Sequence, residues 1–295
     1  MTYRNKMNGR PVLVIFLCAM LCMMLYHATN GSSVVQKKIV FKSETFESEY
    51  FRHIYVITPT FKRPEQIPEL VRLSQTLMLV PNLTWLVIED GYERNELVEN
   101  ILKKFGSRYQ YLLAPMPEKY KSRSQRPRGV SNRNKGLEWI RNYTKTGVVY
   151  FADDDNTYDI ELFREIRKTR TVSMFPVGLV TELGLSSPIV QNCTFTGFYD
   201  GWIAGRKFPV DMAGFAVSVE FLLSRPNAKI PYEVGYEEDG FLKSLSPLEP
   251  SDIQLLASCC SKILVWHTQT VKNKPAKISH SYDNTNIEIL TKLIV

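Results

Sequence analysis

The sequence predicts an α/β fold with a mainly parallel sheet, because strand-like and helix-like segments alternate from about residue 53 onward. Four short runs are almost continuously apolar and rich in β-branched or aromatic residues, as strands covered on both faces are. The segments between them carry apolar residues at helical spacing, which is typical of helices that connect parallel strands. The chain has 295 residues, of which 44% are hydrophobic, and this is enough to bury a sizeable core.

The elements follow in regular order along the chain. The strands are expected at Ile54–Thr58, Trp85–Ile88, Tyr109–Leu113 and Gly147–Phe151. After the first strand, a helix is indicated by Ile67, Leu70, Val71, Leu77 and Met78. After the second strand, another helix is indicated by one apolar face, made of Leu97, Val98, Ile101, Leu102 and Phe105. A third helix is predicted over Arg133–Asn142, before the fourth strand.

Polar and acidic side chains follow three of these strands, namely Thr58-Pro59-Thr60, Glu89-Asp90 and Asp153-Asp154-Asp155. In open parallel sheets, ligands bind beyond the carboxyl ends of the strands. Three consecutive carboxylates repel one another, and a divalent cation such as magnesium, manganese or calcium would offset that repulsion. The alternative is a solvated acidic turn that caps the helix beginning near Asp159.

Basic side chains lie near the same predicted edge. Arg126, Arg128 and Arg133 are just before or at the start of the third helix, where backbone N–H groups also favour anions. Together with a cation and a parallel sheet, these arginines indicate nucleotide-sugar or phosphoryl chemistry.

The overall charge and the spacing of the cysteines bear on possible partners, metal sites and disulfides. The formal net charge is +7, but no dense Lys/Arg run is interleaved with aromatic residues, so no nucleic-acid partner is predicted. Cys18 and Cys22 lie in an N-terminal apolar run, and the other three cysteines show no metal-type spacing. A disulfide from Cys193 to either Cys259 or Cys260 is left open.

The N-terminus resembles a membrane anchor. Residues 11–28 contain the uncharged run Pro11–Tyr26, and Arg4, Lys6 and Arg10 precede it. By the positive-inside rule, residues 1–10 form a cytosolic tail, and the rest of the chain is lumenal. Residues 29–50 are predicted to form a polar stem, and residues 51–295 the catalytic domain. A cleaved signal peptide is the competing interpretation.

Lumenal exposure is also consistent with Asn-X-Thr triplets. They begin at Asn82, Asn142 and Asn192, which are predicted N-glycosylation sites. A further triplet at Asn30 is too close to the predicted membrane anchor.

Several longer strings, read together, are more specific than any single motif. They are Ile57–Pro64, Val80–Asp90, Val148–Tyr158, Pro209–Val217 and Leu264–Thr268. In this order and spacing, from about residue 53 to 270, the chain closely resembles the β-1,3-glucuronosyltransferase family.

The resemblance implies an enzyme of the GT-A type fold. Residues 51–155 would be a UDP-binding half and residues 156–295 an acceptor-binding half. The implied reaction is inverting transfer of glucuronic acid from UDP-glucuronic acid to the 3-hydroxyl of a terminal galactose, with Mn²⁺ as cofactor. The resemblance also implies a single-pass type II protein of the Golgi membrane and a homodimer.

The family's donor-side roles can be carried over to matching positions. Asp155 would bind manganese, whereas Asp153 and Asp154 would hold the uridine part. The remaining donor contacts implied are Asp90 to uracil near Pro59, Arg128 and Arg133 to the donor, and His267 to the diphosphate.

On the acceptor side, Glu238 matches the family's catalytic base, and Trp202, Arg206 and Asp211 match acceptor-binding positions. The base would take the proton from the attacking hydroxyl. Without the resemblance, the residues alone do not distinguish Glu238 from its acidic neighbours Glu237 and Asp239.

Three positions depart from the family pattern. Phe61 replaces an aromatic residue that carries a hydroxyl, Gln269 replaces an arginine, and Ser186 replaces an acceptor-contacting glutamate. These differences support two alternatives. One is a non-catalytic or weakly active paralogue that binds glycans or a partner in the Golgi, and the other is a transferase that uses another UDP-sugar.

Overall fold

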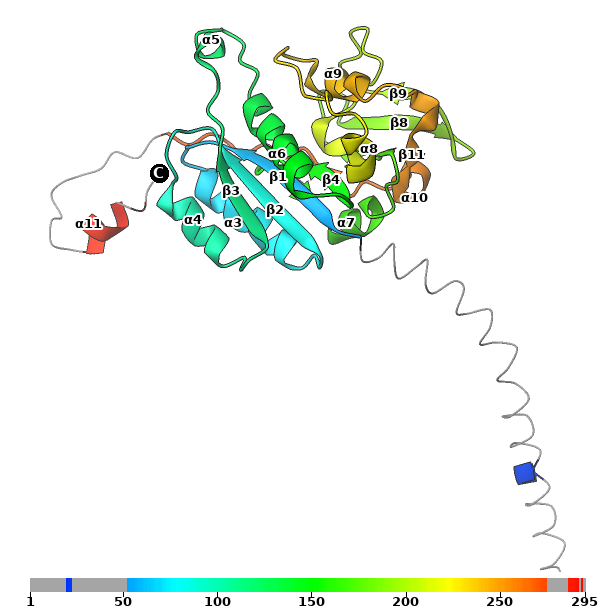
Figure 1. The fold of residues 1–295 in the computed structure, drawn as a ribbon, viewed down its shortest axis with the longest axis horizontal. Coiled ribbons are helices and arrows are strands. Elements are labelled where there is room, and N and C mark those ends of the chain that lie inside the picture. Colours follow the sequence, from blue (N-terminus) through cyan, green and yellow to red (C-terminus); the bar gives the residue numbers. More distant parts are fainter. Residues whose placement is uncertain (1–19, 23–51, 275–285, 292, 294–295) are drawn as a thin grey trace, which may run out of the picture. The chain divides into compact units, whose positions relative to one another are not determined.

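The computed structural model describes residues 20–22, 52–274, 286–291 and 293 (Figure 1). Its larger sheet has seven strands and is mainly parallel. The strand order is β11-β6-β10-β4-β1-β2-β3. In chain order, the strands are β1 (Ile54–Thr60), β2 (Leu83–Glu89), β3 (Tyr109–Leu113), β4 (Val148–Phe151), β6 (Val172–Met174), β10 (Phe215–Ser218) and β11 (Gln254–Leu255).

All four predicted strands are present in this sheet. β1 lies between β2 and β4 and is parallel to both, so Ile57 is opposite Leu86 on one side and Phe151 on the other. β3 continues the parallel arrangement beside β2. Among the described strands of this sheet, only β10, which lies between β4 and β6, runs antiparallel to its neighbours. The predicted α/β class with a mainly parallel sheet is therefore confirmed.

Helices cover both faces of the sheet because consecutive strand residues point to opposite sides. Val56 and Trp85 pack in one core cluster, which includes residues from α3 (Gln66–Met78), α4 (Glu96–Lys103) and α7 (Ile160–Ile166). Ile57 and Leu86 pack in the other, which includes residues from α6 (Val130–Tyr143), α8 (Val219–Leu223) and α9 (Glu237–Ser244). The three helices predicted from apolar spacing are α3, α4 and α6.

A second sheet has five strands in the order β5-β12-β7-β8-β9. These are β5 (Thr157–Tyr158), β7 (Val177–Gly178), β8 (Leu185–Gln191), β9 (Thr194–Tyr199) and β12 (Val265–Trp266). β12 pairs with β5, which follows the acidic triplet directly. This pairing brings the segment around residue 267 next to the end of β4, although the two are more than a hundred residues apart in sequence.

Shorter elements connect these layers. They are α5 (Glu118–Lys121), the 3-10 helices η1 (Met212–Gly214) and η2 (Pro250–Asp252), α10 (Leu256–Cys260) and α11 (Asn286–Thr291). The connection from β3 to α6 projects beyond the sheet and carries α5 (Figure 1).

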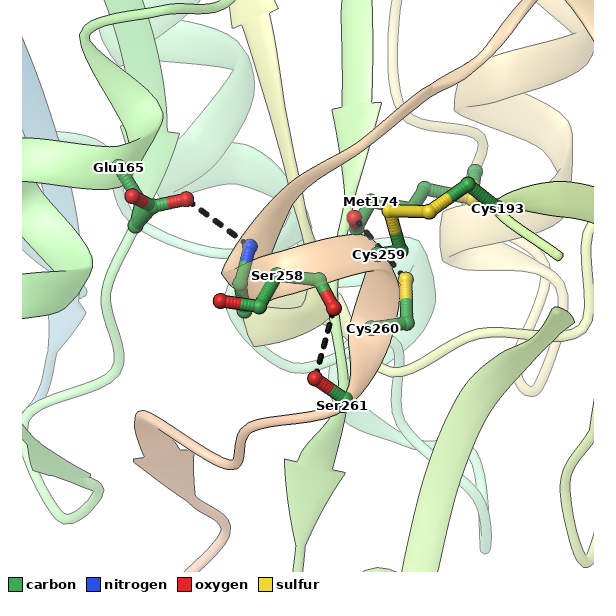
Figure 2. The surroundings of a disulfide bond; sticks show 8 residues. Glu165, Met174, Cys193, Ser258, Cys259, Cys260 and Ser261 are labelled. Atoms are coloured by element: carbon green, nitrogen blue, oxygen red, sulfur yellow. Dashed lines mark hydrogen bonds between the residues drawn. A yellow bond between two sulfur atoms is a disulfide. The ribbon is translucent and has the colours of Figure 1, made fainter.

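A disulfide joins Cys193, in the turn between β8 and β9, to Cys259 in α10, with 5.3 Å between their Cα atoms (Figure 2). The Sγ of the neighbouring Cys260 lies 3.7 Å from the carbonyl oxygen of Met174, and burial raises the pKa of its thiol to about 12. Of the two pairings left open by the sequence, Cys193–Cys259 is therefore the one formed. The bond fixes the tip of the β8–β9 hairpin to the segment that leads into β12.

The N-terminal predictions lie almost wholly outside the described residues. This applies to the cytosolic tail at 1–10, the stem at 29–50 and the anchor at 11–28 apart from Met20–Cys22. In the described part of the chain, no helix has both the length and the apolar character needed to cross a bilayer. By contrast, Asn82, Asn142 and Asn192 are all described, and all three are exposed.

Candidate active site

The turn after β4 carries the acidic triplet, and its three carboxylates have different surroundings. Asp154 is 5% exposed and accepts a 2.7 Å hydrogen bond from the Thr60 hydroxyl at the end of β1. Arg63 lies 2.6 Å from its other oxygen and also pairs with Glu69 of α3. Burial raises the pKa of Asp154, and the bonds to Arg63 and Thr60 oppose that rise. Asp154 thus fixes the turn to β1 and has little surface left for a ligand.

Asp153 pairs with Arg133, which projects from the first turn of α6. Arg133 is 7% exposed, whereas the side chain of Asp153 is 25% exposed, so the buried guanidinium has its counterion at the edge of the solvent. Gly129 precedes α6 with φ +73°, and a Cβ atom there would lie 2.3 Å from Nη1 of Arg133. The left-handed glycine therefore leaves the space that the guanidinium occupies.

Asp155 is the member of the triplet whose carboxylate no described residue holds by a hydrogen bond. Its backbone carbonyl accepts from the Thr268 hydroxyl at 2.7 Å and from Arg72 at 3.3 Å. Burial, together with the nearby charges of Asp153 and Asp154, raises the pKa of its carboxyl to about 6. Such a carboxylate fits a divalent cation, which would offset the repulsion.

Within the described residues, no group of three or more His, Cys, Asp or Glu side chains is arranged to hold a metal ion. A cation at Asp155 would therefore need ligands from outside the protein. Phosphate oxygens and water are the ligands that Mg²⁺-like cations commonly take alongside one or two carboxylates.

The other predicted donor residues lie at the same end of the sheet. Asp90 follows β2, its backbone N–H donates to the carbonyl of Thr60 at 2.8 Å, and its carboxylate accepts from the backbone of Met116 at 2.7 Å. Pro59 is half-buried in β1, and Arg128 is exposed just before α6. The predicted strand-end positions therefore meet at one edge, as the parallel arrangement requires.

His267 reaches this region from just after β12. Its Nδ1 lies 3.0 Å from Oδ2 of Asp211, and its backbone N–H donates to the carbonyl of Gly178. The bond to Asp211 raises the pKa of the imidazole to about 9, although burial opposes the rise. His267 is therefore a cation at neutral pH, and it pairs with a residue predicted to bind the acceptor.

A cavity of about 340 Å³ brings the predicted acceptor residues together. Its walls include Trp202, Arg206, Asp211 and Glu238, which come from the loop after β9, the start of η1 and the first turn of α9. Trp202 is 54% exposed, so its indole is open to a ligand rather than part of the core. Polar groups beside an exposed aromatic face suit a sugar.

The three acids at the start of α9 have different environments, which separates Glu238 from its neighbours. Asp239 is 1% exposed and accepts from the backbone N–H groups of Lys207 and Phe208, at 2.8 and 2.9 Å. Glu237 accepts from the backbone of Gly235 at 2.6 Å. Glu238 lines the cavity, and its side chain accepts a hydrogen bond from no other described residue.

Burial raises the pKa of Glu238 to about 7, and the charges of Asp211 and Glu237 contribute to the rise. Arg133 acts in the opposite direction. A carboxylate with this pKa is suited to accept a proton near neutral pH. The geometry therefore favours Glu238 as the base on physical grounds, independently of the resemblance.

Sequence reasoning missed Asp200, Gln125 and Thr181, which also line the cavity. A single aspartate in a glycine-containing loop resembles an ordinary solvated turn, so Asp200 carried no signal in the sequence. Ser186, one of the departures from the family pattern, is 2% exposed and donates to Asp200 at 2.5 Å.

The other two departures are on the surface. Phe61 is 43% exposed, and the Arg63 guanidinium lies 4.6 Å from its ring centroid. Gln269 is exposed beyond β12.

Comparison with known proteins identifies the family. The glycosyltransferase family 43 profile matches residues 73–271. Galactosylgalactosylxylosylprotein 3-beta-glucuronosyltransferase P of Drosophila melanogaster is 58% identical over 245 residues, covering 82% of this chain and 51% of the relative. Galactosylgalactosylxylosylprotein 3-beta-glucuronosyltransferase 2 of Mus musculus is 43% identical over 274 residues, covering 90% of this chain and 84% of the relative. The chain spans about half the length of the two Drosophila relatives, P and S.

Among solved structures, residues 1–349 of S. aureus TarS are similar with a TM-score of 0.45 and 15% identity, covering 73% of this chain and 60% of that one. On the profile match and the relatives, the chain belongs to glycosyltransferase family 43.

Proposed function

We propose that this protein is an inverting β-1,3-glucuronosyltransferase that moves glucuronic acid from UDP-glucuronic acid to the 3-hydroxyl of a terminal galactose. One observation carries the proposal. Glu238 and Asp211 line the same cavity, and each of them is electrostatically linked to a cation on the donor side, Arg133 and His267 respectively. The proposed base therefore lies in the acceptor cavity within electrostatic reach of Arg133, and His267, the other cation proposed for the diphosphate, pairs with a residue of the same cavity.

The reaction follows from this arrangement. Glu238 takes the proton from the galactose 3-hydroxyl, whose oxygen forms a bond to the anomeric carbon of the glucuronosyl group. The bond from that carbon to the β-phosphate oxygen breaks, the configuration inverts, and UDP leaves. His267 and Arg133 stabilise the negative charge that develops on the leaving diphosphate. A manganese ion held by Asp155 would supply further positive charge at the same diphosphate.

The acceptor is proposed from the names of the relatives. Galactosylgalactosylxylosylprotein describes a protein-linked glycan that ends in galactose, as in the glycosaminoglycan linker, and several relatives carry this name. A terminal galactose on other glycoprotein glycans is the second acceptor within this proposal. Trp202 would stack on the sugar, while Arg206 and Asp211 would bond its hydroxyls.

We further propose a single-pass type II protein of the Golgi membrane that acts as a homodimer. The basic residues before the uncharged run at 11–26 support the anchor and its orientation. The disulfide and the exposed Asn-X-Thr triplets are consistent with an oxidising lumenal compartment. The homodimer is supported by the family resemblance alone.

Donor binding tests this proposal against the alternative donors. The full-length chain in detergent is titrated with UDP-glucuronic acid, UDP-glucose, UDP-galactose and UDP-N-acetylglucosamine, with and without Mn²⁺. The proposal predicts that UDP-glucuronic acid binds most tightly, that Mn²⁺ strengthens this binding, and that Asp155→Asn abolishes the effect of Mn²⁺. Tighter binding of another UDP-sugar would contradict it, and binding of none would favour a non-catalytic protein.

A further inference from the structure

The side chain of Asp200 is almost fully enclosed, although Asp200 is one of the residues that line the proposed acceptor cavity. It is 3% exposed, and the side chain of Arg206, with which it pairs at 3.0 Å, is 5% exposed. Removing one member of such a buried pair leaves an uncompensated charge. The position of Arg206 therefore depends on Asp200.

The two carboxylate oxygens of Asp200 accept hydrogen bonds from different groups. Oδ1 accepts from the backbone N–H of Trp202 at 2.7 Å and from Nη2 of Arg206. Oδ2 accepts from the Ser186 hydroxyl at 2.5 Å. The oxygen of that hydroxyl lies 3.2 Å from the backbone nitrogen of Asp211, which donates to it. One carboxylate thus connects Trp202, Arg206 and Asp211, the three residues proposed to hold the acceptor.

Arg206 retains unused hydrogen-bonding capacity after these contacts. Nη2 is used by Asp200 and by the carbonyl of Trp202, whereas the buried Nε has no partner within the described residues. Arg206 also lines the cavity. A buried donor without a partner is costly unless a ligand uses it. Asp200 and the carbonyl of Trp202 thus hold Arg206 in the wall of the cavity.

We infer that Asp200 is a positioning residue for acceptor binding, which holds Arg206 and Trp202 directly and the backbone of Asp211 through Ser186. This inference rests on the proposed function, because it assigns a role in the same cavity. It gives a role to a buried carboxylate that is followed directly by five exposed residues, 201–205.

The test compares steady-state kinetics of full-length variants, with β-D-galactosyl-(1→3)-D-galactose as the acceptor probe. Asp200→Asn keeps the shape of the side chain and removes the counterion of Arg206. The acceptor KM is expected to rise roughly ten- to hundred-fold, as loss of a charge-assisted hydrogen bond would produce. The donor KM and kcat should change by no more than about threefold, because the variant leaves transition-state contacts intact.

Two further variants separate positioning from general loss of structure. Ser186→Ala removes the hydroxyl that bonds Oδ2 of Asp200 and the backbone of Asp211, and it leaves the contacts of Oδ1 in place. It should raise the acceptor KM by a smaller factor, without loss of folding. Asp159→Asn alters a different Asp, which caps α7 by accepting from Glu161 at 2.8 Å, and both KM values should stay unchanged. A fall in kcat for Asp200→Asn with an unchanged acceptor KM would overturn the inference, because misfolding lowers only the active fraction.

A double-mutant cycle tests whether Asp200 acts through its neighbour. Because both substitutions disrupt the same group, Asp200→Asn combined with Arg206→Gln should raise the acceptor KM little beyond Arg206→Gln alone. Multiplicative effects of the two substitutions would contradict action through Arg206.

Direct binding keeps this inference separate from the proposed function. Calorimetry measures affinity for the same disaccharide in the presence of UDP, and no chemistry is required. Absence of transfer by the native enzyme would count against the proposed function only. Equal disaccharide affinity of native protein and Asp200→Asn would overturn the role of Asp200, whether or not transfer is observed.

Discussion

Asp211 and His267 form an ion pair, with 3.0 Å between Oδ2 of the carboxylate and Nδ1 of the imidazole, although 56 residues separate them in sequence. Asp211 lines the cavity proposed for the acceptor. His267 follows β12, the strand that pairs with β5 after the acidic triplet. The pair therefore connects the two halves of the proposed active site.

The first prediction concerns the charge of His267. Asp211 raises the pKa of His267 from 6.5 to about 9. The contribution of the pair to the free energy of unfolding is therefore fully present below pH 6.5 and is lost as the pH rises through about 9. In Asp211→Asn, the pKa of His267 should fall toward 6.5. NMR titration of the imidazole signals measures it, with His53 as an internal control.

The control is suitable because burial and the charge of Arg167 lower the pKa of His53, and Asp211 is not among the causes. An unchanged pKa of His267 in the variant would show that Asp211 does not hold its proton.

The second prediction concerns the pH profile. Because Glu238 must be ionised to act as a base and its pKa is about 7, kcat/KM should rise as the pH increases through about 7. Glu237→Gln removes one of the charges that raise this pKa, so the midpoint should move to lower pH. The same substitution should leave Glu238 in place, because a glutamine oxygen can still accept from the backbone of Gly235. A rate that is flat between pH 5 and pH 8 would contradict this role.

The third prediction uses two glycines with the same backbone conformation. Gly129 and Gly106 both have φ +73°, so alanine strains the backbone at either position. Only at Gly129 would the added Cβ displace Arg133, whereas nothing lies within 4 Å at Gly106. Gly129→Ala should therefore weaken donor binding at least tenfold more than Gly106→Ala, for a loss of about 1.5 kcal/mol from the Arg133 contact.

Calorimetric titration with UDP measures the difference between the two variants. If both lose the same affinity, backbone strain and not the position of Arg133 accounts for the effect.

The fourth prediction concerns the disulfide. Cys193→Ser should lower the free energy of unfolding by about 2–5 kcal/mol, because the bond closes a loop across a sequence separation of 66. Cys260→Ser should have a much smaller effect, since that thiol makes only a long contact with Met174. Urea unfolding under non-reducing conditions compares them, and equal losses would show that the pairing is not specific to Cys259.

Much of the sheet can be predicted from sequence because its strands are buried on both faces and read as continuous apolar runs. Val148–Phe151, for example, has four consecutive buried residues. The second sheet is harder to predict, because strands such as Val265–Trp266 have two residues and depend on pairing with distant segments. The antiparallel β10 also depends on long-range pairing rather than on a local signal.

Some residues of the candidate site could likewise be predicted from the sequence, and others could not. Asp90 and the triplet Asp153–Asp155 could be predicted because they directly follow predicted strands. The burial of Asp154 against Arg63 could not be predicted, since it depends on how β1 and β4 lie together. Asp200 was also missed, because its role depends on contacts with Ser186 and Arg206 rather than on a motif. The choice of Glu238 needed either the family resemblance or the cavity.

The most direct test of the central claim is transfer of labelled glucuronic acid from UDP-glucuronic acid to a galactose-ended acceptor, by native protein and by Glu238→Gln. With Mn²⁺ present, the native protein should form a β-1,3-linked product. The variant should lose roughly a hundred- to ten-thousand-fold in kcat, as expected for a general base, and still bind the donor. Equal transfer by the variant, or failure of the native protein to bind UDP-glucuronic acid, would contradict the account.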